Sequence, residues 1–295
     1  MMAPARNALL LLLQGWAATV ALAAGPGDSL GELTPGQAVV AERMLAFMST
    51  TEQRFWQNVQ RFDGRGSVEP WVADVPDNGH YEVRVRRGEV VEKAGVMTIM
   101  TTVEKPPFIV GGRWNRFIEL AVHPRTPLVG MLHATLVVQV SAQGVGNIGA
   151  TMDMLKSAQP AEDLAFMDER VAAVFVRHGV DREKYRSRGC GKPDAGAWKW
   201  HRIGTCTGVS MYGPQLVADE PTFALVTDLY GTVMDSYFEI LQKRRRQRYS
   251  SADLAAQDLM RRRWLEDQLF WDILARKFVP YEAWSAVNAP PVVRF

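Results

Sequence analysis

The fold is decided between residues 91 and 153, where the chain reads Val91-Glu92-Lys93-Ala94-Gly95-Val96, then Phe117-Ile118-Glu119-Leu120-Ala121-Val122-His123-Pro124-Arg125-Thr126-Pro127, then Leu132-His133-Ala134, before a glycine-rich turn into Met152-Asp153-Met154. His123 ends one strand-like run, and His133 begins the next. If residues 124–127 form a turn between antiparallel strands, both imidazoles face one cavity, and the carboxylate of Asp153 arrives from the following turn. The pattern therefore predicts a functional site.

A large antiparallel sheet is predicted around this stretch. Tyr81, Val83 and Val85 alternate with polar residues, residues 86–89 have the character of a hairpin turn, and the return strand begins at 90–91. Further strands are expected at 96–102, 117–122 and 131–140. Because the links between them are short, antiparallel pairing is favoured over parallel pairing, which needs long crossovers.

Helices are predicted before and after these strands. Thr34 and Pro35 offer an N-cap and a proline at the first helical position, and this helix extends to a stop at Asp63-Gly64. Acidic residues at 162–163 indicate the start of a second helix that ends at Gly179, and a third is expected from about 221 to 249. The predicted fold class is α+β, a large antiparallel β-sheet flanked by helices.

The size and charge of the chain exclude some classes of protein. With 295 residues, 47% of them hydrophobic and 22% charged, the chain can bury a substantial core, and residues 34–295 are predicted to form one domain after a linker at 25–33. A formal charge of +2 argues against a general polyanion binder, so we expect no nucleic-acid partner. The basic runs at 243–248 and 261–263 are interpreted as solvated helix faces.

The first 24 residues have the character of a secretory signal peptide. Arg6 supplies a positive start, residues 8–13 and 17–24 are apolar, and Ala21-Leu22-Ala23 offers a cleavage signal. We expect export to the periplasm or beyond; a buried or membrane-resting N-terminal helix in a cytoplasmic protein is the alternative. After export, a bridge between Cys190 and Cys206 would stabilise the chain by about 3 kcal/mol. Without export, the two cysteines are more simply unrelated thiols.

Three short motifs carry a resemblance to a known family. Glu92-Lys93-Ala94-Gly95, His123-Pro124-Arg125-Thr126-Pro127 followed by His133, and the tail Pro290-Pro291-Val292-Val293-Arg294-Phe295 resemble oxygen-dependent coproporphyrinogen III oxidase, over residues 40 to 295. That family converts two propionates to vinyl groups in haem biosynthesis. The resemblance implies a homodimer, a porphyrinogen or other tetrapyrrole ligand, and molecular oxygen as co-substrate with no redox cofactor.

The resemblance also implies roles for individual residues. His133 would be the catalytic acid/base group, and Asp153 would accept hydrogen bonds from pyrrole nitrogens. Glu119, His123, Arg125 and Lys93 would bind the substrate. His123, His133 and His201 match positions sometimes assigned to a divalent metal, although their spacing is not a recognised metal signature. The structural alternatives are a histidine hydrogen-bonded at a strand end, a capping Asp153 and a surface ion pair for Arg125.

The departures from the family pattern leave alternatives open. Thr135-Leu136-Val137 stands where the family has Asn-x-Arg, whose arginine clamps a substrate carboxylate, and Met154-Leu155-Lys156 replaces Leu-Thr-Pro after Asp153. The alternatives are an exported, non-catalytic tetrapyrrole-binding relative and an oxidase of another electron-rich heteroaromatic. Residues 144–149 match a dinucleotide fingerprint by letter only. For residues 264–271, the residue pattern permits a helix, whereas the resemblance implies a helix end near Arg262 and then a core strand.

Overall fold

The computed structural model describes residues 30, 33–64, 66–75, 79–101, 112–142, 144, 146–185, 204–211, 216–270 and 279–294. The helices are α1 (Pro35–Asp63), α2 (Ala161–His178), α3 (Glu220–Arg244), α4 (Ser251–Phe270) and α6 (Tyr281–Asn288), with a 3-10 turn at Arg182–Lys184. The strands are β1 (Glu69–Val75), β2 (Gly79–Arg86), β3 (Val91–Thr101), β4 (Gly112–Pro124), β5 (Leu132–Ser141), β6 (Asn147–Met154), β7 (Val209–Ser210) and β8 (Leu216–Val217). In these ranges, no helix is long and apolar enough to cross a membrane. The predicted signal peptide and His201 lie outside the described residues.

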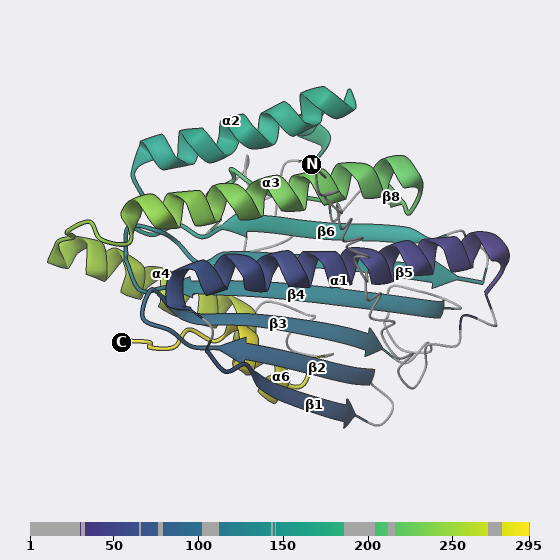
Figure 1. Cartoon of the computed structure of the whole chain (residues 1–295), viewed down its shortest axis with the longest axis horizontal. Coiled ribbons are helices and arrows are strands. Elements are labelled where there is room, and N and C mark those ends of the chain that lie inside the picture. Colours follow the sequence, from purple (N-terminus) through teal and green to yellow (C-terminus); the bar gives the residue numbers. More distant parts are fainter. Residues whose placement is uncertain are drawn as a thin grey trace, which may run out of the picture.

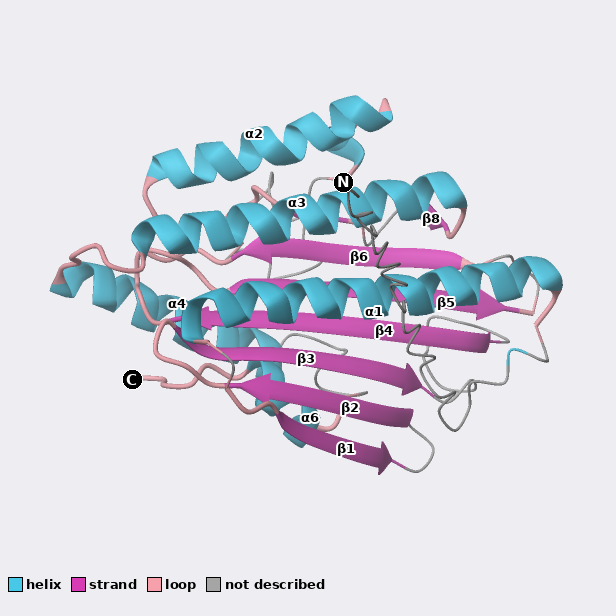
Figure 2. Cartoon of the chain, viewed as in Figure 1, coloured by secondary structure: helices cyan, strands magenta, loops and turns pink. Residues whose placement is uncertain are grey.

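One antiparallel sheet forms the centre of the molecule (Figure 1). Strands β1 to β7 lie side by side in chain order, and β8 pairs with β6 next to β7. Antiparallel pairing in this order lets short connections join β4 to β5 and β5 to β6, as the sequence predicted, whereas α2 lies between β6 and β7. Helices cover both faces of the sheet (Figure 2). The predicted fold class, α+β with a large antiparallel sheet flanked by helices, is confirmed.

Alternation along the strands divides the core into two parts. In β4, Ile118, Leu120 and Val122 point toward α1 and α3, and we call this side the α1 face. Ala121 points to the opposite side, where α4 and α6 pack, which we call the α6 face. Every residue that shares the parity of Ala121 in β4 therefore lies on the α6 face.

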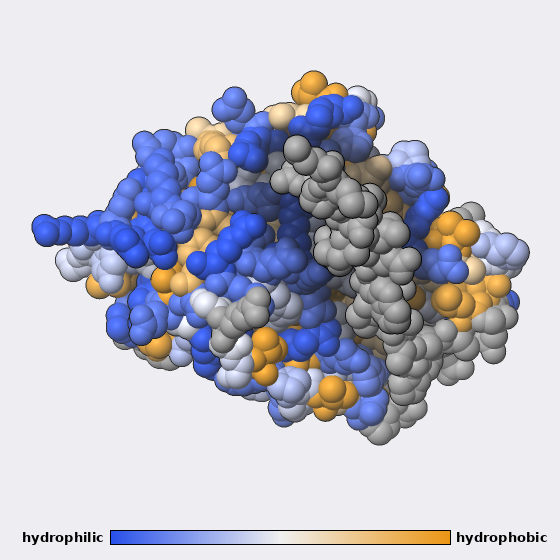
Figure 3. Space-filling view, in the orientation of Figure 1, coloured by the Kyte–Doolittle hydropathy of each residue, from blue (hydrophilic) through white to orange (hydrophobic). Residues whose placement is uncertain are grey.

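Long helices seal the α1 face. Helix α1 crosses β3, β4 and β5, and α3 lies beside it over β6 (Figure 1). The Tyr230 hydroxyl of α3 donates to the backbone carbonyls of Thr135 and Thr151, so it ties the helix to two neighbouring strands. Helix α2 packs against α3, where Arg244 pairs with the buried carboxylate of Asp163 at 2.6 Å. The outward side of these helices is mostly hydrophilic (Figure 3).

The boundaries of α1 agree with its predicted signals. Thr34 and Gln37 form a reciprocal capping box, and Pro35 occupies the first turn. The helix ends at Asp63, before Gly64 with a positive φ of 66°. A left-handed residue at this place costs little for glycine, which has no Cβ.

Two strand predictions need correction. The glycine-rich segment before Asp153 was predicted as a turn, but the turn ends at Gly146, which has a φ of 145°, and residues 147–154 form β6 in register with β5. Asp153 therefore sits on a strand. Strand β1 was not predicted, because it is an exposed edge strand without hydrophobic alternation. The predicted segments at 90–91 and 96–102 belong to one strand, β3.

Helix α4 continues through Phe270, so the expectation of a helix end near Arg262 and a core strand beyond it is wrong. The helical residue pattern explains this outcome. Gln257, Met260, Arg261, Trp264 and Gln268 are the buried residues, and their spacings of three, four and seven fall on one helix face. The α6 face of the sheet is covered by this stripe.

A single carboxylate joins α1 to the turn between β2 and β3. The Asp63 side chain accepts hydrogen bonds from the backbone N–H groups of Glu89, Val90 and Val91 at 2.8–2.9 Å. A Cβ on Gly88 would lie 2.3 Å from the Asp63 carboxyl carbon, so this turn needs glycine to let the carboxylate approach. The turn and the helix end hold each other in place.

We expect Asp63→Ala to lower the free energy of unfolding by about 2 kcal/mol, because three backbone donors lose a charged acceptor. Urea denaturation of the purified protein measures this loss. Glu239→Ala is the matched control, since Glu239 makes one exposed ion pair with Arg170 and should change stability by less than about 0.5 kcal/mol. Equal effects of the two substitutions would contradict a joining role for Asp63.

Candidate functional site

The pairing register brings several predicted site residues onto the α6 face. His133 lies directly opposite Asp153 on β6 and Ala121 on β4. His123 lies opposite Lys93 on β3. Glu119 is two residues before Ala121, so it shares this face and neighbours His133 diagonally. The sheet itself therefore gathers Lys93, Glu119, His123, His133 and Asp153 on one side.

The centre of the site is a buried carboxylate–imidazole pair. The Nε2 atom of His133 lies 2.8 Å from Oε1 of Glu119, and the side chains are 9% and 7% exposed, respectively. The Asn288 amide donates to the same Oε1 at 2.8 Å, and the Trp264 ring lies 4.7 Å from the His133 ring, centre to centre. Within the described ranges, Oε2 of Glu119 and Nδ1 of His133 make no hydrogen bond. Each partner thus keeps one polar atom for another molecule.

Lys93 and His123 hold the end of α6. Lys93 Nζ donates to the carbonyls of Ser285, at 3.2 Å, and Ala289, and Nε2 of His123 lies 3.2 Å from the carbonyl of Val287. Since a carbonyl only accepts, His123 carries its proton on Nε2. Burial, and then the positive charge of Lys93, hold the pKa of His123 well below its ordinary value. The two side chains thus satisfy the carbonyls of Val287 and Ala289 at the C-terminal end of the helix, and Lys93 adds a second donor to the Ser285 carbonyl, which also accepts from the Ala289 amide.

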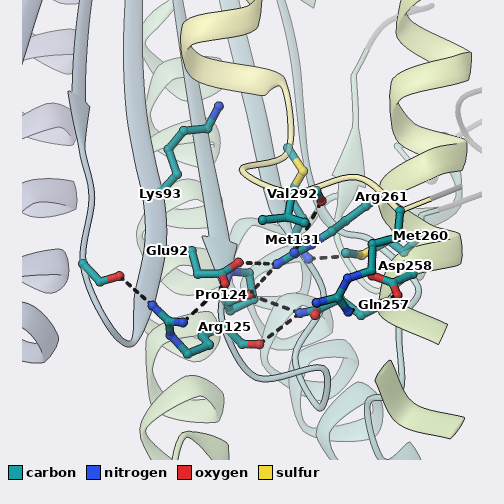
Figure 4. A network of polar contacts seen from close by, with 12 residues as sticks. Glu92, Lys93, Pro124, Arg125, Met131, Gln257, Asp258, Met260, Arg261 and Val292 are labelled. Atoms are coloured by element: carbon teal, nitrogen blue, oxygen red, sulfur yellow. Dashed lines mark hydrogen bonds and ion pairs between the residues drawn. The ribbon is translucent and has the colours of Figure 1, made fainter. Parts of the chain in front are cut away.

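Arg125 lies at the exposed edge of a second network of polar contacts, which joins α4 to the start of β3 and the end of β4 (Figure 4). Arg261 binds Glu92 and the carbonyls of Pro124 and Val292. Arg125 donates to the carbonyl of Glu89 and lies 3.8 Å from the Glu92 carboxylate, with its side chain 56% exposed. Arg125 is therefore the more accessible of these two arginines.

The three sequence motifs meet in space at this place. Glu92 and Lys93 contact the C-terminal segment through Arg261, Ser285 and Ala289. Gly95 lies against α6, and a Cβ on it would come within 3.0 Å of the Val287 backbone. The motif residues are far apart in the sequence, but together they hold the C-terminal segment against β3 and β4.

Asp153 is enclosed by its own set of donors. Its Oδ1 accepts from the Met154 and Gly208 amides and the Thr205 hydroxyl, and its Oδ2 accepts from the Cys206 amide, at 2.8–3.1 Å. Cys206 is disulfide-bonded and has a φ of 63°, and Cys190 lies outside the described residues. Loss of solvation raises the pKa of the Asp153 carboxyl, while its hydrogen bonds act in the opposite direction. In this state Asp153 organises residues 205–208, and its predicted role toward pyrrole nitrogens stays a prediction.

Two residues of the site were not predicted. Asn288 and Trp264 come from α6 and α4, and no local pattern relates them to Glu119 or His133 more than 100 positions earlier. The only signal was indirect, because Asn288 directly precedes the Ala289-Pro290-Pro291 stretch of the tail. Among the described side chains, no three His, Cys, Asp or Glu residues are grouped to hold a metal ion. The predicted metal site includes His201, so it stays a prediction.

Comparison with known proteins finds neither a protein-family model nor a curated protein that matches the chain. The fold and the site define an α+β protein with a buried acid–base pair on one face of an antiparallel sheet.

Lys93 predicts a specific pH dependence of stability. Burial, and secondarily the charge of Arg87, lower the pKa of Lys93 from 10.5 to about 7. Between these values the unfolded chain binds one more proton at this residue, so stability should rise with pH. Relative to Lys93→Met, we expect the wild-type protein to gain up to about 1.4 kcal/mol per pH unit from pH 7 to pH 10. Urea denaturation of both proteins at several pH values between 7 and 10 measures this difference in the free energy of unfolding.

The exposed Lys156 supplies the control for this measurement. Lys156→Met should leave a pH dependence parallel to that of the wild type, because the substitution leaves Lys93 and its buried surroundings unchanged. A Lys93→Met curve that is also parallel would show that Lys93 does not titrate in this range.

Asp153→Asn should loosen residues 204–208. The amide keeps the shape of the carboxylate but replaces one accepting oxygen by a donor, so it cannot serve four hydrogen-bond donors. We expect faster hydrogen exchange at the amides of Cys206 and Gly208, measured by mass spectrometry at peptide level. Asp181→Asn, which alters an exposed helix cap, is the control and should leave this segment unchanged. Unaltered exchange in Asp153→Asn would remove Asp153 from this role.

Proposed function

We propose that the protein is an oxygen-dependent oxidase of a porphyrinogen, of the coproporphyrinogen III oxidase kind, which converts propionates to vinyl groups. The observation that carries the proposal is the Glu119–His133 pair, which is buried, hydrogen-bonded and left with one polar atom on each partner. Such a pair suits proton transfer, because the carboxylate orients the imidazole and fixes which nitrogen carries the proton. The three motifs and the helix-flanked antiparallel sheet agree with that kind of protein.

The proposed reaction needs a proton and an oxidant. For each propionate, the carboxylate, one O2 and one proton give the vinyl group, CO2 and H2O2, so two electrons leave with the broken carbon–carbon and carbon–hydrogen bonds. An electron-rich porphyrinogen can supply these electrons to oxygen without a metal or an organic cofactor. His133 would exchange the proton through Nδ1, since its Nε2 faces Glu119. The predicted export and the implied homodimer belong to this proposal.

A second candidate is a non-catalytic relative that binds a tetrapyrrole. The observation that favours it concerns the groups expected to hold the substrate. Lys93 and Arg125 donate to backbone carbonyls of the chain itself, and both oxygens of Asp153 already accept hydrogen bonds. Val137, which stands in place of the family's arginine, lies half-buried on the α6 face and has no charge. Propionates would need either cations other than these two or Arg125 after its release from the Glu89 carbonyl.

Turnover separates the two candidates. We expect the wild-type protein to convert coproporphyrinogen III in air and not under argon, with vinyl product measured by chromatography and fluorescence after chemical oxidation. His133→Ala should lower kcat at least about 100-fold, because removal of a general acid–base group typically costs that much. His80→Ala is the matched control, since His80 lies at the edge of the sheet beside Asp74 and should retain full activity.

Each result has one consequence. Loss of turnover in both histidine variants would contradict the assignment of His133. Tight porphyrin binding in a fluorescence titration, without any turnover by the wild-type protein, would replace the oxidase by the binding relative.

A further inference from the structure

The Glu119–His133 pair is enclosed by a ring of contacts from two helices. Asn288 Nδ2 donates to Glu119 Oε1, and the backbone carbonyl of Asn288 accepts from the indole N–H of Trp264 at 2.9 Å. The Trp264 ring in turn packs on the ring of His133, with their planes inclined by 55°. The contacts therefore form a closed ring of four residues: Glu119, Asn288, Trp264 and His133.

Neither helix residue has freedom to move away. Asn288 and Trp264 are both fully buried, at 0% exposure. Lys93 and His123 bind the carbonyls on either side of Asn288, which fixes the end of α6 over β3 and β4. The side chain of Asn288 is thus presented to Glu119 by a seated backbone.

One atom of Asn288 indicates why this residue is present. Its Oδ1 is buried and has no hydrogen-bond partner among the described residues. Rotating the amide by half a turn would not help, because Oδ1 would then face the oxygen of Glu119, and two acceptors repel. Buried polar groups without a partner are rare and call for an explanation beyond packing. Here the chain leaves an oxygen unpaired in order to aim an N–H at the carboxylate.

We propose that Asn288 and Trp264 are positioning residues, which hold the Glu119 carboxylate and the His133 ring in one fixed hydrogen-bonded arrangement. The inference rests on the proposed function in naming proton transfer as the purpose of the pair. Two donors on Oε1 stop the carboxylate from rotating, and the indole ring stops the imidazole from swinging away. His133 then keeps its proton on Nε2, from which it donates to Glu119, and Nδ1 stays available. A carboxylate fixes the tautomer of a histidine in this way in acid–base sites.

The test removes the donor without touching the pair. In Asn288→Ala, the Nε2 proton of His133 should lose its protection, and its low-field proton NMR resonance, assigned by comparison with His133→Gln, should broaden beyond detection. Ser285→Ala is the matched control on the same helix, because the Ser285 hydroxyl bonds only to Glu282 and its carbonyl stays in place for Lys93. That variant should keep the resonance.

Turnover gives a second readout. If the wild type oxidises coproporphyrinogen III, Asn288→Ala should lower kcat about tenfold or more with KM within twofold, and Asn288→Ser, which restores a short donor, should recover part of the loss. Trp264→Phe keeps a ring on His133 but removes the indole N–H, so it should give an intermediate effect. It also serves as the deciding variant if Asn288→Ala does not fold, as judged by near-ultraviolet circular dichroism.

The outcomes separate the two proposals. A folded Asn288→Ala protein that keeps both the resonance and its kcat overturns the positioning role, whatever the substrate. A wild-type protein that shows the resonance, loses it in Asn288→Ala and turns over no porphyrinogen supports the positioning role and overturns the proposed function instead.

Discussion

The C-terminal carbonyls of α6 impose the constraint on which the α6 face depends. A helix leaves its last carbonyls without partners, and burying them requires donors from elsewhere. His123 supplies a donor to the carbonyl of Val287, Trp264 to that of Asn288 and Lys93 to that of Ala289, while the Ser285 carbonyl accepts from Lys93 in addition to the Ala289 amide. The helix can therefore lie on the sheet only where these side chains meet it, and Gly95 is the point at which the two backbones come closest.

This constraint changes the interpretation of the motif residues. Lys93 and His123 are residues of the kind that bind anionic ligands, and each has a lowered pKa caused mainly by burial. A neutral amine keeps two N–H donors and a neutral imidazole keeps one, so both can satisfy carbonyls without carrying charge. Polar groups buried for structure and polar groups buried for catalysis look alike in a sequence. The strand register places all four side chains on one face, and only their partners distinguish them: Lys93 and His123 bind carbonyls of the α6 segment, whereas Glu119 and His133 bind each other.

Much of the fold could be predicted, because its signals are local. The capping residues of α1, the period-two pattern of β2 and the short links between strands gave the fold class correctly. Strand β6 was missed because Gly149 and the two glycines just before the strand were interpreted as a turn, and only the pairing with β5 shows the strand. The extent of α4 was correctly permitted by its residue pattern, and the resemblance gave the wrong answer there.

The site could be predicted less well. The structure places His123, His133 and Asp153 on one face of the sheet, with Asp153 on a strand instead of the predicted turn, and the partners of each depend on segments far away in the chain. Asn288 reaches Glu119 across 169 positions. No periodicity spans such a distance, because it is set by the packing of α6, and that packing depends in turn on the burial of a few donors.

The late position of α6 in the chain has a consequence for biosynthesis. A ribosome that has just made β1 to β6 leaves Glu119 and His133 on an uncovered sheet face, since residue 288 is synthesised more than 130 positions after the last of these strands. Until then the nascent chain exposes an apolar surface with a polar pair in its middle, which is the kind of surface that molecular chaperones bind. Glu119 and His133 can therefore be enclosed only after α6 has been synthesised.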